Sequence, residues 1–345
     1  MRLAAEYVLP LRWEHDDSLD DMTAYLCTLA EWIDVTVVDG SDAPVFAVHA
    51  TAWAAHVRHV RPTVATGANG KVRGVLTGIS LARHERVILA DDDVRYDRNG
   101  LDAIVSALRD ADLVAPTNIF RPLPWHARWD TGRSLLNRAL HHDYPGTCGV
   151  RRAALERTGG YDADALFENL ELERTVRAGG GAIRQLTDVY VMRRPPTLRH
   201  FLGQRVRQAY DSRAQPGRLL LELALAPTLL ALRRRPGILM LIAFGIAVVA
   251  ERGRRSGGGR RIYPRSAAVW APLWVVERAV TSWLALGAHA RGGVRYAGTR
   301  VRHAATPLRD LRRRHSTTRA PSAGRESSAS RASTRPATVS SIDAG

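Results

Sequence analysis

The sequence predicts an α/β domain over residues 1–215, with a mostly parallel sheet covered by helices on both faces, followed by membrane-associated helices. Through residue 198, short segments rich in Val, Ile and Leu alternate with longer segments of helical period. Alternation of this kind is typical of a parallel sheet with helices on both faces. From about residue 217 the composition changes to apolar runs separated by arginines. We therefore expect a membrane-associated helical region at residues 216–302 and a disordered basic tail at residues 303–345.

Each predicted strand is short and apolar and is followed by turn residues; the strands cover residues 6–11, 34–38, 86–90, 112–115 and 188–192. The predicted helices lie between them, at residues 20–32, 70–83, 98–110, 127–140, 152–158 and 170–178. Two of these strands end in acidic residues, the first at Asp39 and the second at Asp91, Asp92 and Asp93. Because ligands of such sheets bind at the carboxyl ends of the strands, we expect the functional site at this edge.

The C-terminal part contains three apolar runs. Residues 219–232 and 237–250 are 14 residues each and are separated by three arginines and a proline. Each run falls short of the ~20 residues that cross a bilayer as a helix. The third run, residues 267–288, is long enough but carries Glu277 and Arg278 midway, so an interfacial helix and a packed span are both possible. Because three adjacent arginines are costly to translocate, we expect a membrane hairpin that faces the cytoplasm; two tilted spans or buried core helices are the alternatives.

The net charge of +16 is unevenly distributed along the chain. Residues 1–198 contain 23 Lys or Arg and 27 Asp or Glu, a net charge of −4, whereas residues 199–345 carry a net charge of +20. The basic half is interleaved with apolar runs, as expected for segments that flank a membrane on its cytoplasmic side. It contains no nucleic-acid recognition motif, so a nucleic-acid-binding protein is the weakest interpretation.

The expected location is the cell membrane, with the catalytic domain in the cytoplasm. The two cysteines, Cys27 and Cys148, are too few for a disulfide framework and indicate a reducing compartment. The first residues lead directly into a predicted strand and contain no apolar segment typical of a signal peptide.

Three consecutive acids after an apolar strand predict a metal site. Repulsion among Asp91, Asp92 and Asp93 is relieved by a cation, and carboxylates with open coordination positions suit Mn²⁺ or Mg²⁺, which also bind phosphate oxygens. The alternative is a solvated acidic turn that caps the following helix. Lys71, the only lysine among 50 basic residues, follows Asn69 and Gly70 at a predicted helix start, where backbone N–H groups and positive charge favour a diphosphate.

Four motifs together resemble the family-two inverting glycosyltransferases of GT-A fold, a Rossmann-like architecture, and especially their membrane-associated, ceramide glucosyltransferase-like branch. The resemblance covers roughly residues 5–215. In chain order the motifs are an Asp after the second strand (Asp39), a D-x-D motif (Asp91 and Asp93), a Gly-Gly-Tyr turn followed by Glu168-Asn169, and a Q-x-x-R element (Gln204 and Arg207). The resemblance implies that Asp39 binds the nucleoside, that Asp91 binds ribose and metal, and that Asp93 is the main metal ligand.

The resemblance also implies a carboxylate base that removes the acceptor's proton. The family usually has Glu-Asp here, with the Asp as base, but this chain has Asn169, which cannot accept that proton. Glu168 is the nearest substitute and Glu171 lies one turn further; a surface role is the alternative for both. Gln204 and Arg207 share one face of a predicted helix, near the acceptor and diphosphate or on the bilayer surface.

The expected function is metal-dependent transfer of a sugar from a nucleotide-sugar, uridine-linked, to a lipid or cell-envelope glycan acceptor, by inverting single displacement. A processive synthase is disfavoured, because the apolar region is too small for a channel of several long spans. The competing hypothesis is a catalytically degenerate scaffold that binds sugar nucleotides at the membrane, which the asparagine at position 169 motivates.

Overall fold

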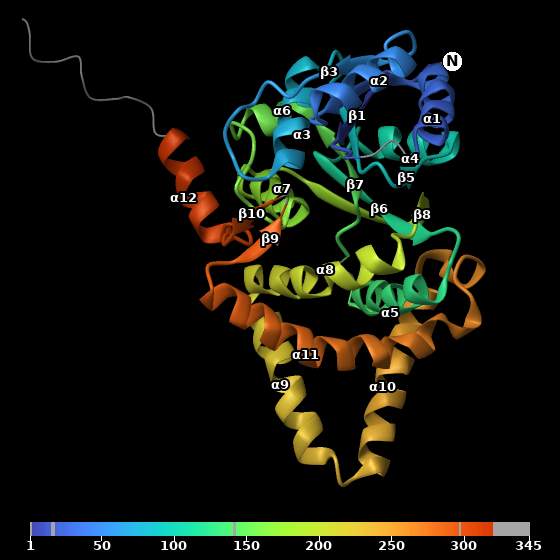
Figure 1. The fold of residues 1–345 in the computed structure, drawn as a ribbon, viewed down its shortest axis with the longest axis vertical. Coiled ribbons are helices and arrows are strands. Elements are labelled where there is room, and N and C mark those ends of the chain that lie inside the picture. The colour runs from blue at the N-terminus through green and yellow to red at the C-terminus, as the bar shows by residue number, and fades with distance from the viewer. Residues whose placement is uncertain (1, 15–17, 141–142, 297, 320–345) are drawn as a thin grey trace, which may run out of the picture.

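The computed structural model describes residues 2–14, 18–140, 143–296 and 298–319 (Figure 1). Its centre is an eight-stranded sheet in the order β3-β2-β1-β4-β7-β6-β8-β5. Strands β1, β2, β3 and β4 pair in parallel, as do β6 and β8, whereas β7 runs antiparallel to both β4 and β6. The strands are β1 (Glu6–Leu11), β2 (Asp34–Asp39), β3 (Arg58–Val60), β4 (Arg86–Ala90), β5 (Val94–Arg95), β6 (Leu113–Phe120), β7 (Thr147–Arg151) and β8 (Ile183–Arg193).

Helices cover both faces of this sheet, which confirms the predicted α/β class. Alternate residues of β1 point to opposite faces, so Tyr7 and Leu9 join one apolar cluster and Val8 joins the other. The first cluster includes α1 (Leu19–Trp32), α2 (Ala43–Trp53) and α4 (Arg98–Ala107). The second includes α3 (Gly70–Leu81), α6 (Arg152–Glu156) and α7 (Glu168–Ala178).

The five predicted strands and the six predicted helices are confirmed, with ends that shift by up to three residues except in β6, which ends five residues later, and β8, which begins five residues earlier. Strands β3, β5 and β7 and helix α2 were not predicted. β7 has the sequence Thr-Cys-Gly-Val-Arg, which lacks the apolar alternation of the other strands. Its position is set by pairing with β4 and β6 over long sequence distances, which local pattern does not reveal.

Helix α3 packs unusually close to β1 because its contact residues are glycines. A Cβ placed on Gly78 would lie 2.2 Å from Val8 Cγ1. We expect Gly78→Ala to lower the free energy of unfolding by about 1–3 kcal/mol, because the added methyl overpacks the core. Chemical denaturation in detergent measures it. Gly203→Ala on α8, where the added Cβ meets open space, is the control and should be neutral or stabilising; equal effects would contradict the close packing.

Below the sheet, a layer of helices leads to an apolar projection (Figure 1). Helices α5 (Trp125–Ala139) and α8 (Leu198–Tyr210) lie under the sheet, and α11 (Ala271–Ala290) packs against both. Helices α9 (Pro216–Leu232) and α10 (Pro236–Arg255) extend away from this layer. Among the described residues, one helix is long and apolar enough to cross a membrane, α10 with the turn that follows it, Pro236–Arg261.

Helix α11 is amphipathic, which explains the two charges in the middle of its apolar sequence. Arg278 is 1% exposed, and the Glu277 side chain pairs with Arg205 of α8 at 2.7 Å. Large apolar side chains cover the other face and are exposed, namely Leu273, Val276, Val280, Trp283 and Leu284. The charges therefore face the protein, and the apolar side chains face outward.

The region from residue 303 differs from the expected disordered tail. After the hairpin β9 (Val294–Tyr296) and β10 (Thr299–Val301), the backbone at His303 and Ala304 accepts hydrogen bonds from Leu166 and Phe167. Residues Leu308–Arg319 then form α12. The apolar pair Ala304 and Ala305 is buried against α7 and α8, which sequence composition alone does not indicate. The rest of the predicted tail, residues 320–345, lies outside the described residues.

Candidate functional site

The two acid-terminated strands end at the same edge of the sheet, as expected. β1 pairs in parallel with both β2 and β4, so Asp39 and the triplet beginning at Asp91 follow neighbouring parallel strands. Trp13, just after β1, connects the two: its backbone N–H donates to Ser41 Oγ, and its indole N–H donates to Asp92 Oδ2 at 2.7 Å. Asp92 is thus held by Trp13, while Asp91 and Asp93 bind other partners.

Lys71 connects two of the predicted site residues. Its Nζ lies 2.5 Å from Asp91 Oδ1 and 2.6 Å from Glu168 Oε1. The buried side chain of Asn69 caps α3 by accepting hydrogen bonds from the N–H groups of Lys71 and Val72, which fixes the start of the helix. Burial opposes the charged form, but the carboxylates of Asp91 and Glu168 raise the pKa of Lys71 well above its ordinary value. Lys71 is therefore a permanent cation at this site.

Asp93 pairs with Arg193, the last residue of β8. Arg193 Nε donates to Asp93 Oδ2 at 2.7 Å, and Arg193 Nη2 lies 3.5 Å from Asp91 Oδ2. Burial and the neighbouring charge of Asp91 raise the pKa of Asp93, against the lowering effect of Arg193. Gly146 lines the same space, since a Cβ there would lie 2.7 Å from Asp91 Oδ2. A residue without a side chain is needed beside these carboxylates.

The acid pair fits a divalent cation. Asp93 Oδ1 is buried and has no hydrogen-bond partner in the part of the chain that the structure describes. A buried carboxylate oxygen without a partner is costly unless a cation or water completes it. Asp91 and Asp93 supply the hard oxygen ligands that Mn²⁺ and Mg²⁺ prefer, with coordination positions left for phosphate oxygens.

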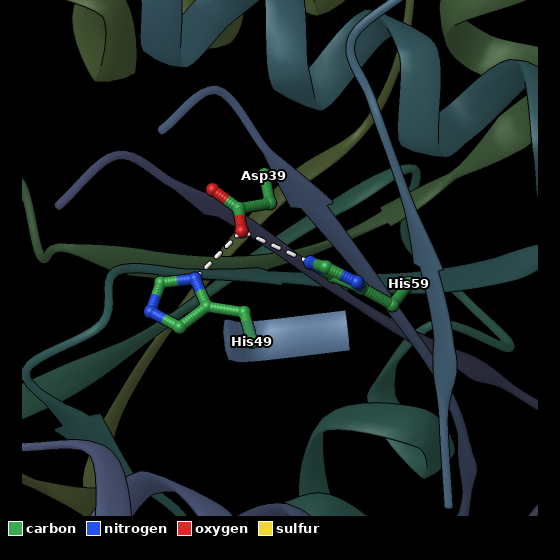
Figure 2. Close-up of side chains that lie close together, drawn as sticks. All are labelled: Asp39, His49 and His59. Atoms are coloured by element: carbon green, nitrogen blue, oxygen red, sulfur yellow. Dashed lines mark hydrogen bonds and ion pairs between the residues drawn. The ribbon is translucent and has the colours of Figure 1, made fainter. Parts of the chain in front are cut away.

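Asp39 lies in a second cluster that the sequence did not reveal (Figure 2). Its Oδ2 is 2.7 Å from His49 Nδ1 and 2.9 Å from His59 Nε2, and its Oδ1 accepts the Ser41 N–H. All three side chains are buried, and the ligand-capable atoms of Asp39, His49 and His59 lie within 4.8 Å of one another, close enough to hold a metal ion. Burial opposes ionisation, yet the hydrogen bonds from His59, Ser41 and His49 hold the pKa of Asp39 well below its ordinary value.

This depressed pKa predicts an acid-sensitive contribution to stability. A carboxylate whose folded pKa lies below its unfolded value stabilises the protein above the unfolded pKa, and this contribution is lost as the pH falls toward the folded one. Between about pH 5 and pH 2, we expect the free energy of unfolding of the wild type to fall by roughly 2 kcal/mol more than that of Asp39→Asn. Thermal midpoints in detergent across this range measure it, with Asp102→Asn, an exposed acid, as the control. Equal pH dependence in all three proteins would contradict it.

The predicted Q-x-x-R element lies on α8, below the acidic edge. Gln204 contacts His200, and the Arg207 guanidinium lies 5.4 Å from the ring centre of Tyr296. Burial and the charge of Arg207 lower the pKa of His200, whereas Asp92 acts in the opposite direction. Burial and the charge of Glu168 raise the pKa of Tyr296, whereas the charges of Lys71 and Arg207 lower it. Both predicted residues of α8 therefore lie on the side of the acids.

Glu171 lies apart from this group. It is fully buried, and its Oε2 accepts the backbone N–H of Thr306 at 2.6 Å. The contact fixes the segment before α12 to α7. Among the described residues, no hydrogen bond or ion pair joins Glu171 to Lys71, Asp91 or Asp93, and its burial closes it to an acceptor. Of the two predicted bases, the structure brings only Glu168 to the acids.

Sequence reasoning missed Trp13, Arg193, Tyr296, His49 and His59. Arg193 and Tyr296 follow in the chain more than 100 residues after Asp91 and reach the site only through the sheet order and the β9 strand. His49 and His59 are 10 residues apart, on α2 and β3, two elements that were not predicted. The one available signal was the position of Trp13, just after the strand that lies between the two acid-terminated strands.

No protein-family model and no curated protein sequence matches the chain. Among solved structures, it is similar to mannosyltransferase PcManGT from Pyrobaculum calidifontis in complex with GDP-Man and Mn²⁺, at 15% identity and a TM-score of 0.48, covering 82% of this chain and 88% of that one. It is similar to glucosyl-3-phosphoglycerate synthase from Mycobacterium tuberculosis in complex with Mn²⁺, uridine diphosphate and phosphoglyceric acid, at 20% identity and a TM-score of 0.38, covering 58% and 73%. A mycobacterial protein gives 17% identity and a TM-score of 0.39, covering 57% and 69%.

Proposed function

We propose that this protein is a metal-dependent glycosyltransferase of the family-two, GT-A type, which transfers a sugar from a uridine-linked nucleotide-sugar to a lipid or cell-envelope glycan. One observation carries the proposal. The carboxylates of Asp91 and Asp93 follow a buried parallel strand, have one unpartnered oxygen and lie beside the permanent cation Lys71. A site for a nucleoside diphosphate requires carboxylates that bind a divalent metal ion and a positively charged side chain that binds phosphate.

In this proposal, the chain's own residues divide the work. Asp91 and Asp93 would hold Mn²⁺ or Mg²⁺, which would supply Lewis-acid stabilisation of the departing diphosphate. Lys71 and Arg207 face the same space and stabilise the negative charge that develops there. Asp39, fixed by His49 and His59, positions the nucleoside side of the donor. Gln204 of α8 contributes to the acceptor side.

Glu168 is the proposed base, which accepts the acceptor's hydroxyl proton while that oxygen attacks the anomeric carbon. It lies at the first residue of α7, 17% exposed and paired with Lys71. We expect Glu168→Gln to lower kcat about 100-fold with little change in donor affinity, because proton removal is lost while the size is kept. Steady-state transfer and donor binding measure the two effects. Glu156→Gln, an exposed acid on α6, is the control, and full activity of Glu168→Gln would remove Glu168 from this role.

The membrane part of the proposal rests on exposed apolar side chains. Helix α10 has 20 residues, which gives about 30 Å, near the thickness of a bilayer core. Its side chains Met240, Leu241 and Phe244 are 66–73% exposed, an arrangement that water disfavours. With the outward apolar face of α11 beside it, the hairpin α9–α10 anchors the protein to the cell membrane and leaves the sheet in the cytoplasm.

The second candidate function is a membrane scaffold that binds sugar nucleotides without turnover. Two observations favour this function. Asn169 occupies the position at which the family that the sequence resembles has its base, and Glu168 is already ion-paired with Lys71.

A donor screen separates the two functions. Detergent-solubilised protein is incubated with Mn²⁺, a lipid extract and each nucleotide-sugar, and the release of nucleoside diphosphate is followed. Release that depends on both lipid and Mn²⁺ supports transfer. Binding of a nucleotide-sugar without release supports the scaffold, and absence of both would overturn the proposal.

A further inference from the structure

Arg193 occupies the position between the two metal-binding carboxylates. Its Nε is 2.7 Å from Asp93 Oδ2, and its Nη2 is 3.5 Å from Asp91 Oδ2. The other oxygen of Asp91 faces Lys71 at 2.5 Å. Of the four oxygens of the two acids, Asp93 Oδ1 alone therefore has no partner among the described residues.

A divalent cation held by both acids would need an oxygen of Asp91, and both are already paired, Oδ1 with Lys71 and Oδ2 with Arg193. The surroundings leave little space for both cations, because a Cβ on Gly146 would already lie 3.2 Å from Arg193 Cζ and 2.7 Å from Asp91 Oδ2. Two cations side by side also repel one another at this partly buried site. Binding of the metal and the Arg193 ion pair are consequently alternative states of the site.

The guanidinium remains at the site after it leaves the acids. Arg193 ends β8, and its backbone is fixed by pairing with β5 and β6. It also lines a small pocket with Asn118 and Asp143, so its side chain has space on that side. A guanidinium forms bidentate hydrogen bonds with phosphate oxygens, and the diphosphate of the donor brings negative charge to this position.

We propose that Arg193 is an exchangeable cation, which neutralises Asp91 and Asp93 in the free protein and moves to the donor's diphosphate when the metal binds. This inference rests on the proposed function and names a further donor-binding residue of the same site. It has a thermodynamic consequence. The metal alone must displace Arg193 without compensation, whereas metal and diphosphate together provide Arg193 with a new partner, so each ligand strengthens the binding of the other.

The test measures binding and needs no turnover. The affinity for Mn²⁺ alone is determined by electron paramagnetic resonance, and the affinity for uridine diphosphate with Mn²⁺ by calorimetry. For Arg193→Gln we expect about tenfold tighter binding of Mn²⁺ alone, because the competing cation is gone. We expect about tenfold weaker binding of uridine diphosphate with Mn²⁺, because the bidentate contact is lost.

Arg194→Gln is the matched control. Arg194 is the next residue, and its side chain pairs with Asp21, away from the acid pair. It should keep both wild-type affinities. Arg193→Lys, which keeps the charge, should bind Mn²⁺ alone as weakly as the wild type, and circular dichroism checks that all variants are folded.

Two outcomes would overturn the inference. One is Mn²⁺ binding by Arg193→Gln that is no tighter than by Arg194→Gln, and the other is unchanged affinity for uridine diphosphate with Mn²⁺. Both presuppose that the wild type binds the two ligands. A wild type that binds neither Mn²⁺ nor a nucleoside diphosphate would instead contradict the proposed function itself.

Discussion

Asp93→Asn is expected to lower kcat/KM about 100- to 10,000-fold and to abolish the tight binding of Mn²⁺. Asp93 carries the buried Oδ1 that has no protein partner in the described part of the chain. The amide is the same size but neutral, so it is a poor ligand for a hard divalent cation. Loss of the metal removes several kcal/mol of stabilisation of the departing diphosphate, and each 1.36 kcal/mol is about tenfold in rate. Transfer assays with the donor found in the screen, together with Mn²⁺ titration, measure the effect.

The neighbouring acid provides a matched control within the same triplet. Asp92 accepts the indole N–H of Trp13, and an asparagine oxygen can still accept that hydrogen bond. Asp92→Asn should therefore retain activity within about threefold, which corresponds to the ~0.6 kcal/mol of a modest surface change. Equal losses in the two variants would show that the triplet acts only through its total charge.

Arg205→Met is expected to lower the free energy of unfolding by about 3–5 kcal/mol. Arg205 joins three helices: Nη1 lies 3.0 Å from Asp130 of α5, and Nη2 lies 2.7 Å from Glu277 of α11. All three side chains are less than 10% exposed. Removal of the shared cation leaves Glu277 without this ion pair and leaves Asp130 with Arg133, 3.4 Å away, so the cost of burying the two carboxylates is no longer fully compensated. The thermal midpoint in detergent should fall by several degrees.

Arg199→Met, an exposed position on the same helix, is the control and should leave the midpoint within about 1 °C. A further change isolates the mechanism. In Arg205→Met, the additional substitution Glu277→Gln removes the carboxylate charge that has lost its partner. It should recover part of the lost free energy of unfolding. A single variant Arg205→Met as stable as the wild type would contradict the role of this ion pair in joining α8 to α11.

The sequence predicted the parts of the fold that local pattern determines. The strands that end at Asp39 and Asp91 are continuous apolar segments, and strand–helix alternation places both acids at one edge. The sequence shows that the third apolar run contains charges. It does not show which face of the helix Glu277 and Arg278 occupy, and on that face depends whether such a run would span a membrane or lie on it. In the structure the side chains of Glu277 and Arg278 are buried toward the rest of the protein, which is a tertiary property that the sequence does not reveal.

The site itself was predicted in part. Lys71, Asp91 and Glu168 come together as one ion-paired group, although Lys71 and Glu168 are 97 residues apart. Glu171 was assigned to catalysis from its helical spacing alone, yet the chain after β10 returns to α7 and occupies it. Arg193 could not be predicted, because β8 reaches the acids through its place in the sheet and carries no motif.

The location of a bound metal distinguishes between two groups of described residues that could hold one, Asp91 with Asp93 and Asp39 with His49 and His59. Crystals grown with uridine diphosphate and Mn²⁺ would be measured at the manganese absorption edge, where anomalous scattering locates the ion. We expect a peak at Asp91 and Asp93, next to the diphosphate, with Arg193 displaced from Asp93. A peak at Asp39, His49 and His59, with the Arg193 ion pair intact, would contradict it.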